Sequence, residues 1–268
     1  MLKIRVIPTL FLMNGLIVRS EGFSKFQVIG NPYSELERYS QWLADELVYV
    51  DITREGSHDL RRSDHKVKDE GDDILSILRE ISRHAFMPLT FGGRITNLEQ
   101  VDRFLQNGAD KVIVNTGGYR RPELLEEIAR KHGSQALVVG IDVKRDGNGR
   151  LAMHVDQGRE RVPDDPADYA RRVASLGAGE IFVNSIDRDG SARGYDTEAI
   201  RAIAEVVTVP VVACGGVGTF EHFRSGISEG GASAIAAGNI FHFTENSYKR
   251  AKRLLRDRGF NVRYPYPR

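Results

Sequence analysis

Small and polar side chains in this sequence follow short apolar runs, at points where β-strands would end. Asp142 comes directly after the apolar run 136–141, and its carboxyl group could act as a general acid or base. The alternative is a carboxylate that only forms an ion pair with Lys144 or Arg188. The residues that end the other runs could bind phosphate or hydroxyl groups; they are Asp51, Gly92, Gly93, Arg94, Asn115, Thr116, Asn184, Asp189, Gly190, Gly215, Gly216, Gly238 and Asn239.

Metal and thiol chemistry find no support in the sequence. The seven histidines show no metal-ligand spacing, and Cys214, the single cysteine, has no base beside it in the sequence. We therefore expect neither a metal nor a cofactor. A single cysteine also excludes a disulfide framework and suits a reducing compartment, so we expect a cytoplasmic protein.

Two copies of one pattern organise the chain. Residues 88–116 and 210–239 each contain a β-branched run, a Gly-Gly turn, an amphipathic helical stretch, a Gly-Ala pair and a second apolar run. The first glycines of the two turns, Gly92 and Gly215, are separated by 123 residues. Duplicated strand–helix units of this size predict an α/β fold, a closed (β/α)8 TIM barrel with duplicated half-barrels. We expect one domain over residues 1–268.

The predicted barrel places the chemistry at one end. In such barrels the carboxyl ends of the strands form the active face, and the amino ends mostly serve stability. The two Gly-Gly turns therefore predict two phosphate sites on opposite sides of one mouth. A phosphorylated small molecule is the expected ligand, and one with a phosphate at each end would span the mouth. The alternative is that these glycines only form turns.

The composition argues against two classes of partner. The chain has 38 Lys and Arg against 37 Asp and Glu, so it lacks the concentrated basic charge that nucleic-acid binding needs. No apolar run approaches the ~18 residues typical of a membrane-spanning helix. The apolar start of the chain is interrupted by Pro8 and Asn14-Gly15, so we interpret it as the first strand rather than a signal peptide.

Three segments fall outside the repeating strand–helix pattern. Residues 20–30 form a long loop containing glycine that could close over a ligand. Residues 54–72 contain almost no apolar side chains, and their dense mixed charge is typical of a solvated loop, with a lid or docking surface as the alternative. Residues 261–268 form a short C-terminal tail rich in Pro and Tyr.

Four charged residues begin predicted strands at the amino-terminal end of the barrel. They are Arg5, Glu46, Lys111 and Glu180, hereafter the floor ring. Two basic and two acidic groups could close a ring across the barrel floor. From the residues alone, a salt-bridged plug is the simplest interpretation.

The ordered motifs of the chain resemble one family over nearly its whole length. The chain is similar to HisF, the cyclase subunit of imidazole glycerol phosphate synthase, in segments 6–19, 44–52, 88–95, 108–116, 132–144, 177–190, 194–196, 211–218 and 240–243. The resemblance implies a HisH-like glutaminase partner and passage of ammonia through the barrel to the far mouth. It implies that the floor ring is the ammonia gate, that Asp110 contacts the glutaminase, and that Asp142 is a catalytic aspartate.

The match departs from the family where the chemistry would occur. The resemblance places a catalytic aspartate at the end of the first strand, and Phe11 stands there. Arg94 replaces the third glycine of a phosphate turn, and the 54–72 loop is about twelve residues longer than expected. Arg19 stands in place of a lysine, a milder change, and the resemblance implies that it binds the phosphorylated ligand. Phenylalanine cannot transfer a proton, and acid/base groups typically contribute ~10²–10⁴-fold each.

The retained floor ring and the lost carboxylate lead to three hypotheses. The first is a WbuZ-like relative of HisF that conducts ammonia to an N-acetyl sugar amidotransferase, which converts an acetamido to an acetamidino group in surface-polysaccharide synthesis. The second is a true cyclase of histidine biosynthesis that uses Asp142 and Asp51. The third, an isomerase of the sister phosphoribosyl family, is disfavoured, because that chemistry also requires a carboxylate on the first strand and has no use for a gated floor.

Overall fold

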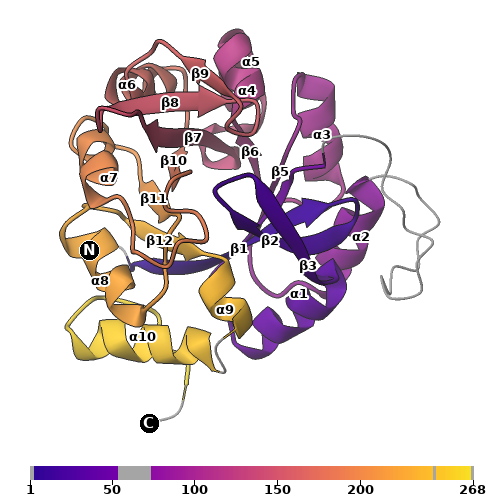
Figure 1. Cartoon of the computed structure of the whole chain (residues 1–268). Coiled ribbons are helices and arrows are strands. Elements are labelled where there is room, and N and C mark those ends of the chain that lie inside the picture. Colours follow the sequence, from indigo (N-terminus) through magenta and orange to yellow (C-terminus); the bar gives the residue numbers. More distant parts are fainter. Residues whose placement is uncertain (1–2, 54–73, 244–245, 267–268) are drawn as a thin grey trace.

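The computed structural model describes residues 3–53, 74–243 and 246–266. Within these residues, eight parallel strands form a closed barrel (Figure 1): β1 (Arg5–Met13), β4 (Leu47–Asp51), β5 (Leu89–Gly92), β6 (Lys111–Val114), β7 (Leu137–Arg145), β10 (Glu180–Ser185), β11 (Val211–Cys214) and β12 (Ala234–Ala237). Each strand pairs with the next in this order, β12 pairs with β1, and β7 pairs with β10. The predicted closed (β/α)8 barrel is confirmed.

Helices on the outside of the barrel connect the strands (Figure 1). They are α1 (Pro32–Gln41), α2 (Ile74–His84), α3 (Leu98–Gln106), α4 (Thr116–Arg120), α5 (Glu123–His132), α6 (Pro166–Ser175), α7 (Thr197–Ala204), α8 (Phe220–Ser228), α9 (Asn239–Phe243) and α10 (Ser247–Asp257), with a 3-10 turn at Ser134–Ala136. Several begin at a polar cap, as when the Asp165 side chain accepts from the N–H groups of Ala167 and Asp168. Their apolar faces pack on the barrel, so the strand ends keep fixed positions.

The two copies of the sequence repeat form matching β–turn–α–β units. Both turns need glycine, because Gly93 has φ +112° and Gly216 has φ +98°. A Cβ atom at Gly93 would lie 2.2 Å from the carbonyl oxygen of Asp51. The turn backbone therefore packs directly on the neighbouring strand end, and a side chain at Gly93 would have to displace it.

Two antiparallel additions extend the barrel sheet at the active face. β2 (Leu16–Glu21) and β3 (Lys25–Gly30) form a hairpin that pairs with β1. β8 (Leu151–Val155) and β9 (Glu160–Val162) extend β7 in the same way. The expected loop at residues 20–30 is thus the second half of a hairpin, because the chain turns back at Asn14-Gly15 and the apolar run 16–18 pairs with β1 rather than leaving the sheet.

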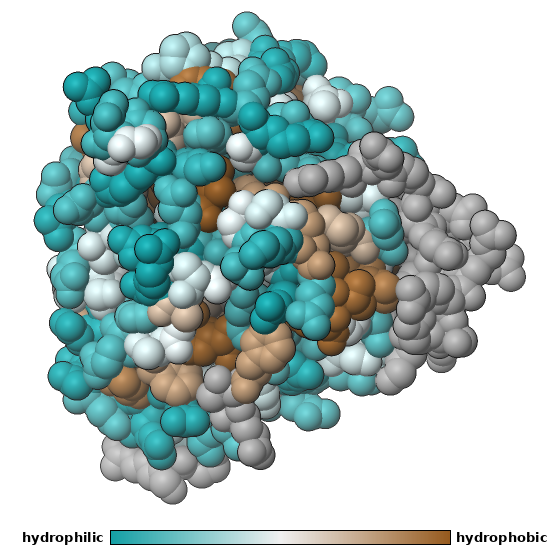
Figure 2. Space-filling model, viewed as in Figure 1, coloured by the Kyte–Doolittle hydropathy of each residue, from teal (hydrophilic) through white to brown (hydrophobic). Residues whose placement is uncertain are grey.

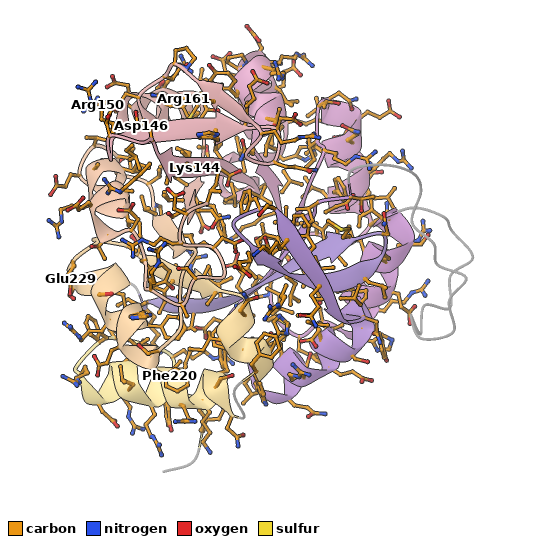
Figure 3. All side chains as sticks on the ribbon, in the orientation of Figure 1. Lys144, Asp146, Arg150, Arg161, Phe220 and Glu229 are labelled. Atoms are coloured by element: carbon orange, nitrogen blue, oxygen red, sulfur yellow. The ribbon has the colours of Figure 1, made fainter. Side chains whose placement is uncertain are left out.

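Figure 3 shows the tight turn that begins the β8–β9 addition, where Asp146, Arg150 and Arg161 lie together. The Asp146 carboxylate accepts from the backbone N–H of Arg150 and lies 3.5 Å from the Arg161 guanidinium. These contacts join the β7–β8 turn to β9.

The C-terminal tail packs on the body of the protein rather than extending from it. Val262 bridges to Ile4, the Tyr266 hydroxyl donates to the Trp42 carbonyl, and the Arg256 guanidinium lies 4.1 Å from the centre of the Tyr264 ring. The 54–72 loop lies outside the described residues. Among the described residues, no helix has the length and apolar character needed to cross a bilayer.

Candidate functional site

A cavity of about 410 Å³ opens at the carboxyl ends of the barrel strands. We call it the mouth cavity. It is lined by Phe11, Ser20, Phe23, Phe26, Val50, Asp51, Ile52, Gly93, Arg94, Ile95, Thr96, Ile113, Asn115, Thr116, Gly117, Gly140, Asp142, Asp156, Gln157, Phe182 and Asn184. These residues come from β1, the β2–β3 hairpin, β4 to β8 and β10, and none comes from β11 or β12. The mouth cavity therefore occupies one side of the barrel mouth.

Asp142 is the titratable group best suited to proton transfer in the mouth cavity. Burial raises its pKa to about 7; a hydrogen bond from Asn115 opposes the shift, and the Asp189 carboxylate adds to it. The Asn115 Nδ2 atom donates to Asp142 Oδ2 at 2.8 Å. Within the described residues, Asp142 forms no ion pair with Lys144 or Arg188, so that alternative is wrong; the Lys144 side chain is exposed near β8 (Figure 3). A carboxyl group with this pKa can both give and take a proton near neutral pH.

Asp142→Asn is expected to raise the free energy of unfolding near pH 8. An unfolded Asp titrates near ~3.9, so between about pH 4 and pH 7 the unfolded chain loses a proton that folded Asp142 keeps. Stability therefore falls as pH rises through this window and is unaffected by the group at lower pH. A difference of about three pKa units corresponds to ~4 kcal/mol, which partial solvent access reduces to about 1–3 kcal/mol.

Denaturant unfolding of wild type and Asp142→Asn at pH 4, 6 and 8 measures this effect. The gain should be small at pH 4 and largest at pH 8. Asp257→Asn, at an exposed helix end, is the matched control and should show no such trend. A gain for Asp142→Asn that is equal at all three values would contradict a raised pKa.

Phe11 forms part of the apolar wall of the mouth cavity. Its ring lies edge-on to Phe23 in the hairpin turn, with 6.5 Å between the ring centres. Asp51 also lines the cavity; it is buried, and its Oδ1 atom accepts from the N–H of Thr53 at 3.0 Å. The end of the first strand thus contributes packing and no proton-transfer group.

The two Gly-Gly turns differ in what they offer a ligand. Gly93, Arg94, Asn115 and Thr116 line the mouth cavity, whereas Gly92 packs against Ile113 and does not. The Arg94 side chain is exposed, and within the described residues it makes no ion pair or hydrogen bond. Its φ is +58°, a conformation uncommon for a residue with a side chain.

The opposite side of the mouth is covered by the β2–β3 hairpin. Ser20 Oγ donates to Asp189 Oδ2 at 2.5 Å, and Asn239 Nδ2 donates to the Ser20 carbonyl at 3.3 Å. Arg19 extends along the hairpin to Phe243, with its guanidinium 5.7 Å from the ring centre. The structure therefore does not bring eight predicted binding residues to the mouth cavity: Arg19, Gly92, Asp189, Gly190, Gly215, Gly216, Gly238 and Asn239.

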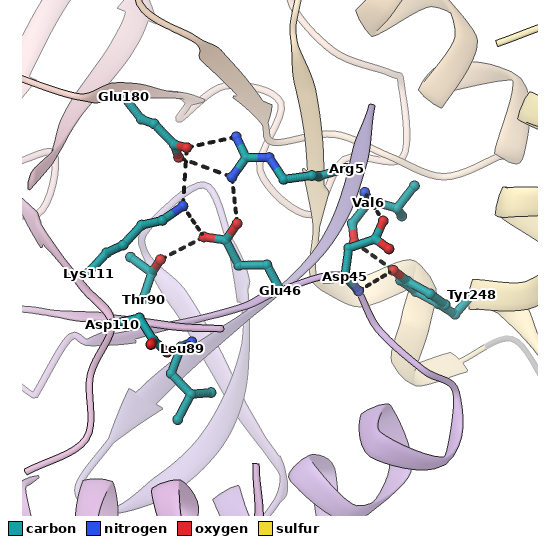
Figure 4. Close-up of polar contacts among 10 residues, drawn as sticks. All are labelled: Arg5, Val6, Asp45, Glu46, Leu89, Thr90, Asp110, Lys111, Glu180 and Tyr248. Carbon is teal, nitrogen blue, oxygen red and sulfur yellow. Dashed lines mark hydrogen bonds and ion pairs between the residues drawn. The ribbon is translucent and has the colours of Figure 1, made fainter. Parts of the chain in front are cut away.

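The four floor-ring residues meet at the amino-terminal end of the barrel (Figure 4). Arg5 lies 2.5 Å from Glu46 through Nη1 and 2.9 Å from Glu180 through Nη2. The Lys111 Nζ atom lies 3.1 Å from an oxygen of each carboxylate. Burial lowers the pKa of Arg5, but the two carboxylates more than offset this and raise it overall. The ring is closed and consists of four charge-assisted contacts.

Alternate residues lead from the floor ring to the mouth cavity. Successive inward positions of a strand are two residues apart, so Ile7, Val48, Ile113 and Phe182 form the next layer above the four ring residues. All four are buried, and with Val138, Val212, Cys214, Ala234 and Ala236 they form an apolar cluster. Ile113 and Phe182 also line the mouth cavity, so this cluster reaches it.

Sequence comparison identifies the family. A family model for histidine biosynthesis proteins matches residues 5–247. The chain belongs to this family. It is 40% identical over 263 residues to the imidazole glycerol phosphate synthase subunit HisF of Chlorobium luteolum, covering 98% of this chain and all of that protein. It is 37% identical, with the same coverage, to the HisF subunit of Alkaliphilus metalliredigens.

The contacts that support the floor ring were not foreseen from the sequence. The Thr90 hydroxyl donates to Glu46 at 2.8 Å. Beside it, the Asp45 N–H donates to the Tyr248 hydroxyl (Figure 4). Buried Lys252 pairs with the same Asp45 at 2.6 Å. Asp110, the predicted glutaminase contact, is exposed at this end and accepts from the Leu89 N–H at 2.8 Å.

Sequence reasoning also missed residues that line the mouth cavity. Phe23 and Phe26 come from the hairpin, and Asp156 and Gln157 come from the β8–β9 turn. The prediction considered only strand ends, whereas these residues lie in excursions from the barrel. The Asn14-Gly15 pair between two apolar runs was the available signal for the first turn of this excursion. Among the described residues, no cluster of three or more His, Cys, Asp or Glu could hold a metal ion.

Proposed function

We propose that this chain is a HisF-type synthase subunit that conducts ammonia within a glutamine-dependent amidotransferase complex. A HisH-like glutaminase would bind the amino-terminal face, where Asp110 is exposed. Ammonia would cross the floor ring, pass the apolar cluster and reach the mouth cavity. The observation that carries the proposal is the closed floor ring, which stands below a buried apolar path to the mouth.

The contacts of the floor ring identify the member that can move. Arg5 contacts both Glu46 and Glu180, so both carboxylates keep a cationic partner when Lys111 withdraws. Lys111 is partly exposed and uses one nitrogen atom for both contacts. A salt-bridged ring opens at small cost only if no buried charge is left unpaired, and withdrawal of either cation meets this condition because each carboxylate contacts both. Lys111 is the more weakly held of the two, since Arg5 binds the carboxylates through two nitrogen atoms. Neutral ammonia could then enter the apolar layer, whereas ammonium would be opposed by desolvation.

The acceptor is proposed from the residues at the mouth. Phe11 stands where the resemblance to HisF places a catalytic carboxylate, so we propose little or no cyclase activity. We propose that the ammonia serves amidation of an N-acetyl sugar in surface-polysaccharide synthesis, with a separate N-acetyl sugar amidotransferase as second partner. Loss of an acid/base residue together with a retained floor ring supports a changed acceptor.

A second candidate is the cyclase subunit of imidazole glycerol phosphate synthase. Two observations favour it: the identity of 37–40% to HisF subunits, and the pKa of Asp142, which is suited to acid–base catalysis. Asp51 would be the second carboxyl group, since it also lines the mouth cavity. Asp142 and Asp51 could then serve both proton transfers, and no carboxylate would be needed at position 11.

Reconstitution with the two partners tests the proposal. The barrel, a HisH-like glutaminase and an N-acetyl sugar amidotransferase are combined, and amidated sugar is measured per glutamate released. We expect tight coupling with the barrel present and free ammonia without it. Equal product per glutamate with and without the barrel would overturn the conduit. Efficient turnover of the histidine-pathway substrate would favour the second candidate.

A further inference from the structure

We propose that the mouth cavity itself binds the acceptor end of the substrate, an N-acylated sugar that carries a single anionic group. The anionic group would lie at Arg94 and the amide at Asn184. This inference rests on the proposed function for the identity of the sugar. It differs from the two-phosphate ligand expected from the Gly-Gly turns, because only one of the two sides lines the mouth cavity.

The β2–β3 hairpin already uses the polar groups of the loop that follows β10. The Asp189 side chain accepts from Ser20 Oγ and from the Phe23 N–H, and the Asp189 carbonyl accepts from the Gly22 N–H at 3.1 Å. A Cβ atom at Gly190 would lie 2.5 Å from the Ser20 carbonyl oxygen. The hairpin therefore fills the space that a second anionic group would need.

The turn after β11 is satisfied internally as well. The His222 Nδ1 atom accepts from the N–H groups of Gly218, at 3.1 Å, and Thr219, at 3.3 Å. The Gly216 carbonyl accepts from the Gly194 N–H at 2.7 Å. Donors that could have faced an anion on this side are thus bonded to the protein itself.

Arg94 provides the receptor for an anion on the open side. It holds a left-handed backbone conformation, which costs about 1–3 kcal/mol and is enriched at ligand-binding sites. Its guanidinium is exposed at the cavity and has no partner among the described residues. A guanidinium binds one phosphate or carboxylate in a bidentate manner. The Thr96 and Thr116 residues line the cavity beside it.

Asn184 provides the receptor for an amide at the inner end. Its side chain is 4% exposed, and its Oδ1 atom has no hydrogen-bond partner among the described residues. A buried acceptor without a partner costs about 1–3 kcal/mol, which an N–H donor from a ligand would recover. On the neighbouring strand Asp142 pairs in register with Asn184 and, when protonated, can donate to an amide carbonyl.

Apolar side chains surround these polar groups. Phe11, Phe23 and Phe182 line the same cavity, and they suit an acyl methyl group and the apolar faces of a sugar ring. Phe23 is itself in a left-handed conformation, with φ +54°, at the hairpin turn that places its ring beside Phe11. A cavity of about 410 Å³ lies within the ~300–1,000 Å³ typical of small-molecule sites. An acetamido group held here would face the apolar path from the floor ring.

Isothermal titration of the full chain with four probes tests the assignment. N-acetylglucosamine 1-phosphate has both features, glucose 1-phosphate lacks the amide, and N-acetylglucosamine lacks the anion. Fructose 1,6-bisphosphate carries two anionic groups. The first probe should bind at least ~10-fold more tightly than the second or the third, since each lost feature leaves a polar partner unpaired. The bisphosphate should bind no more tightly than glucose 1-phosphate.

Variants assign the two ends. Arg94→Gly should weaken the first probe at least ~10-fold and keep or raise the melting temperature, because glycine relieves the positive φ; Arg94→Lys should retain part of the affinity. Asn184→Ala should remove the preference for the first probe over glucose 1-phosphate. Arg253→Gln, on the exposed face of α10, is the matched control and should change nothing.

Three results would overturn the inference: equal binding of the first two probes, tighter binding of the bisphosphate, or unchanged affinity in Arg94→Gly. Because the titration needs neither partner enzyme, it is separate from the test of the conduit. Failed binding with intact coupling rejects this inference alone. Intact binding with failed coupling rejects the proposed function instead.

Discussion

With ammonium salt and the histidine-pathway substrate, the protein should turn over at least ~10²-fold more slowly than a HisF subunit that has both carboxylates. The physical reason is Phe11, whose ring lies in the apolar wall of the mouth cavity against Phe23 and can neither give nor take a proton. Asp142 retains a suitable pKa, so one of two proton-transfer groups remains. Steady-state product formation with saturating ammonium measures the difference without involving a glutaminase.

Phe11→Asp alone should restore little of this activity. Arg94 would still alter one side of the mouth, and the hairpin would still cover Asp189 and Gly190 on the other. The matched control is Phe26→Asp, which places a carboxylate on the hairpin side of the same cavity. If the wild-type protein turns over as fast as an enzyme with both carboxylates, the proposal of little or no cyclase activity is wrong and the second candidate is supported.

Damage to the floor ring should uncouple glutamine hydrolysis from amidation. In the reconstituted complex, Lys111→Ala is expected to lower the ratio of amidated product to glutamate, while amidation from free ammonium salt changes less. The contacts explain the expected loss of coupling, because Lys111 spans Glu46 and Glu180 and its removal opens the floor of the barrel. Glu180→Ala should act in the same direction, since it removes one contact from both Arg5 and Lys111 and leaves Glu46 as their shared partner.

The free energy of unfolding should fall by different amounts when different members of the floor ring are removed. Lys111→Ala leaves both carboxylates paired with Arg5, so we expect a loss of only about 1–2 kcal/mol. Glu46→Ala removes a buried carboxylate that contacts Arg5, Lys111 and Thr90, and should cost about 3–5 kcal/mol. Denaturant unfolding measures both changes.

An exposed ion pair gives the control for both measurements. Lys131 lies 2.7 Å from Asp102 on the outside of the barrel, and Lys131→Ala should leave coupling and stability nearly unchanged. If the product-to-glutamate ratio stays at the wild-type value in both Lys111→Ala and Glu180→Ala, the ring is a structural plug and the conduit proposal is wrong.

The barrel and the floor ring could be predicted from the sequence because both depend on patterns that are local or repeated. Each strand–turn–helix unit is encoded within about thirty residues, and its repetition 123 residues later indicates closure into one barrel. A charged residue at each of four strand starts points inward at the same level, because side chains alternate along every strand. The ring geometry then follows from the fold.

The shape of the mouth depended on the tertiary structure. The Ser20–Asp189 hydrogen bond joins residues 169 apart in sequence, and no local period predicts it. That contact holds the hairpin over the part of the mouth near Asp189, and Arg94 and Asn184 line the cavity that remains open. The pKa of Asp142 was likewise decided by burial and by its Asn115 partner, which the strand pairing brings together. Desolvation and long-range contacts exist only once the chain has folded, so the sequence could name Asp142 but could not assign its pKa or the half of the mouth that remains open.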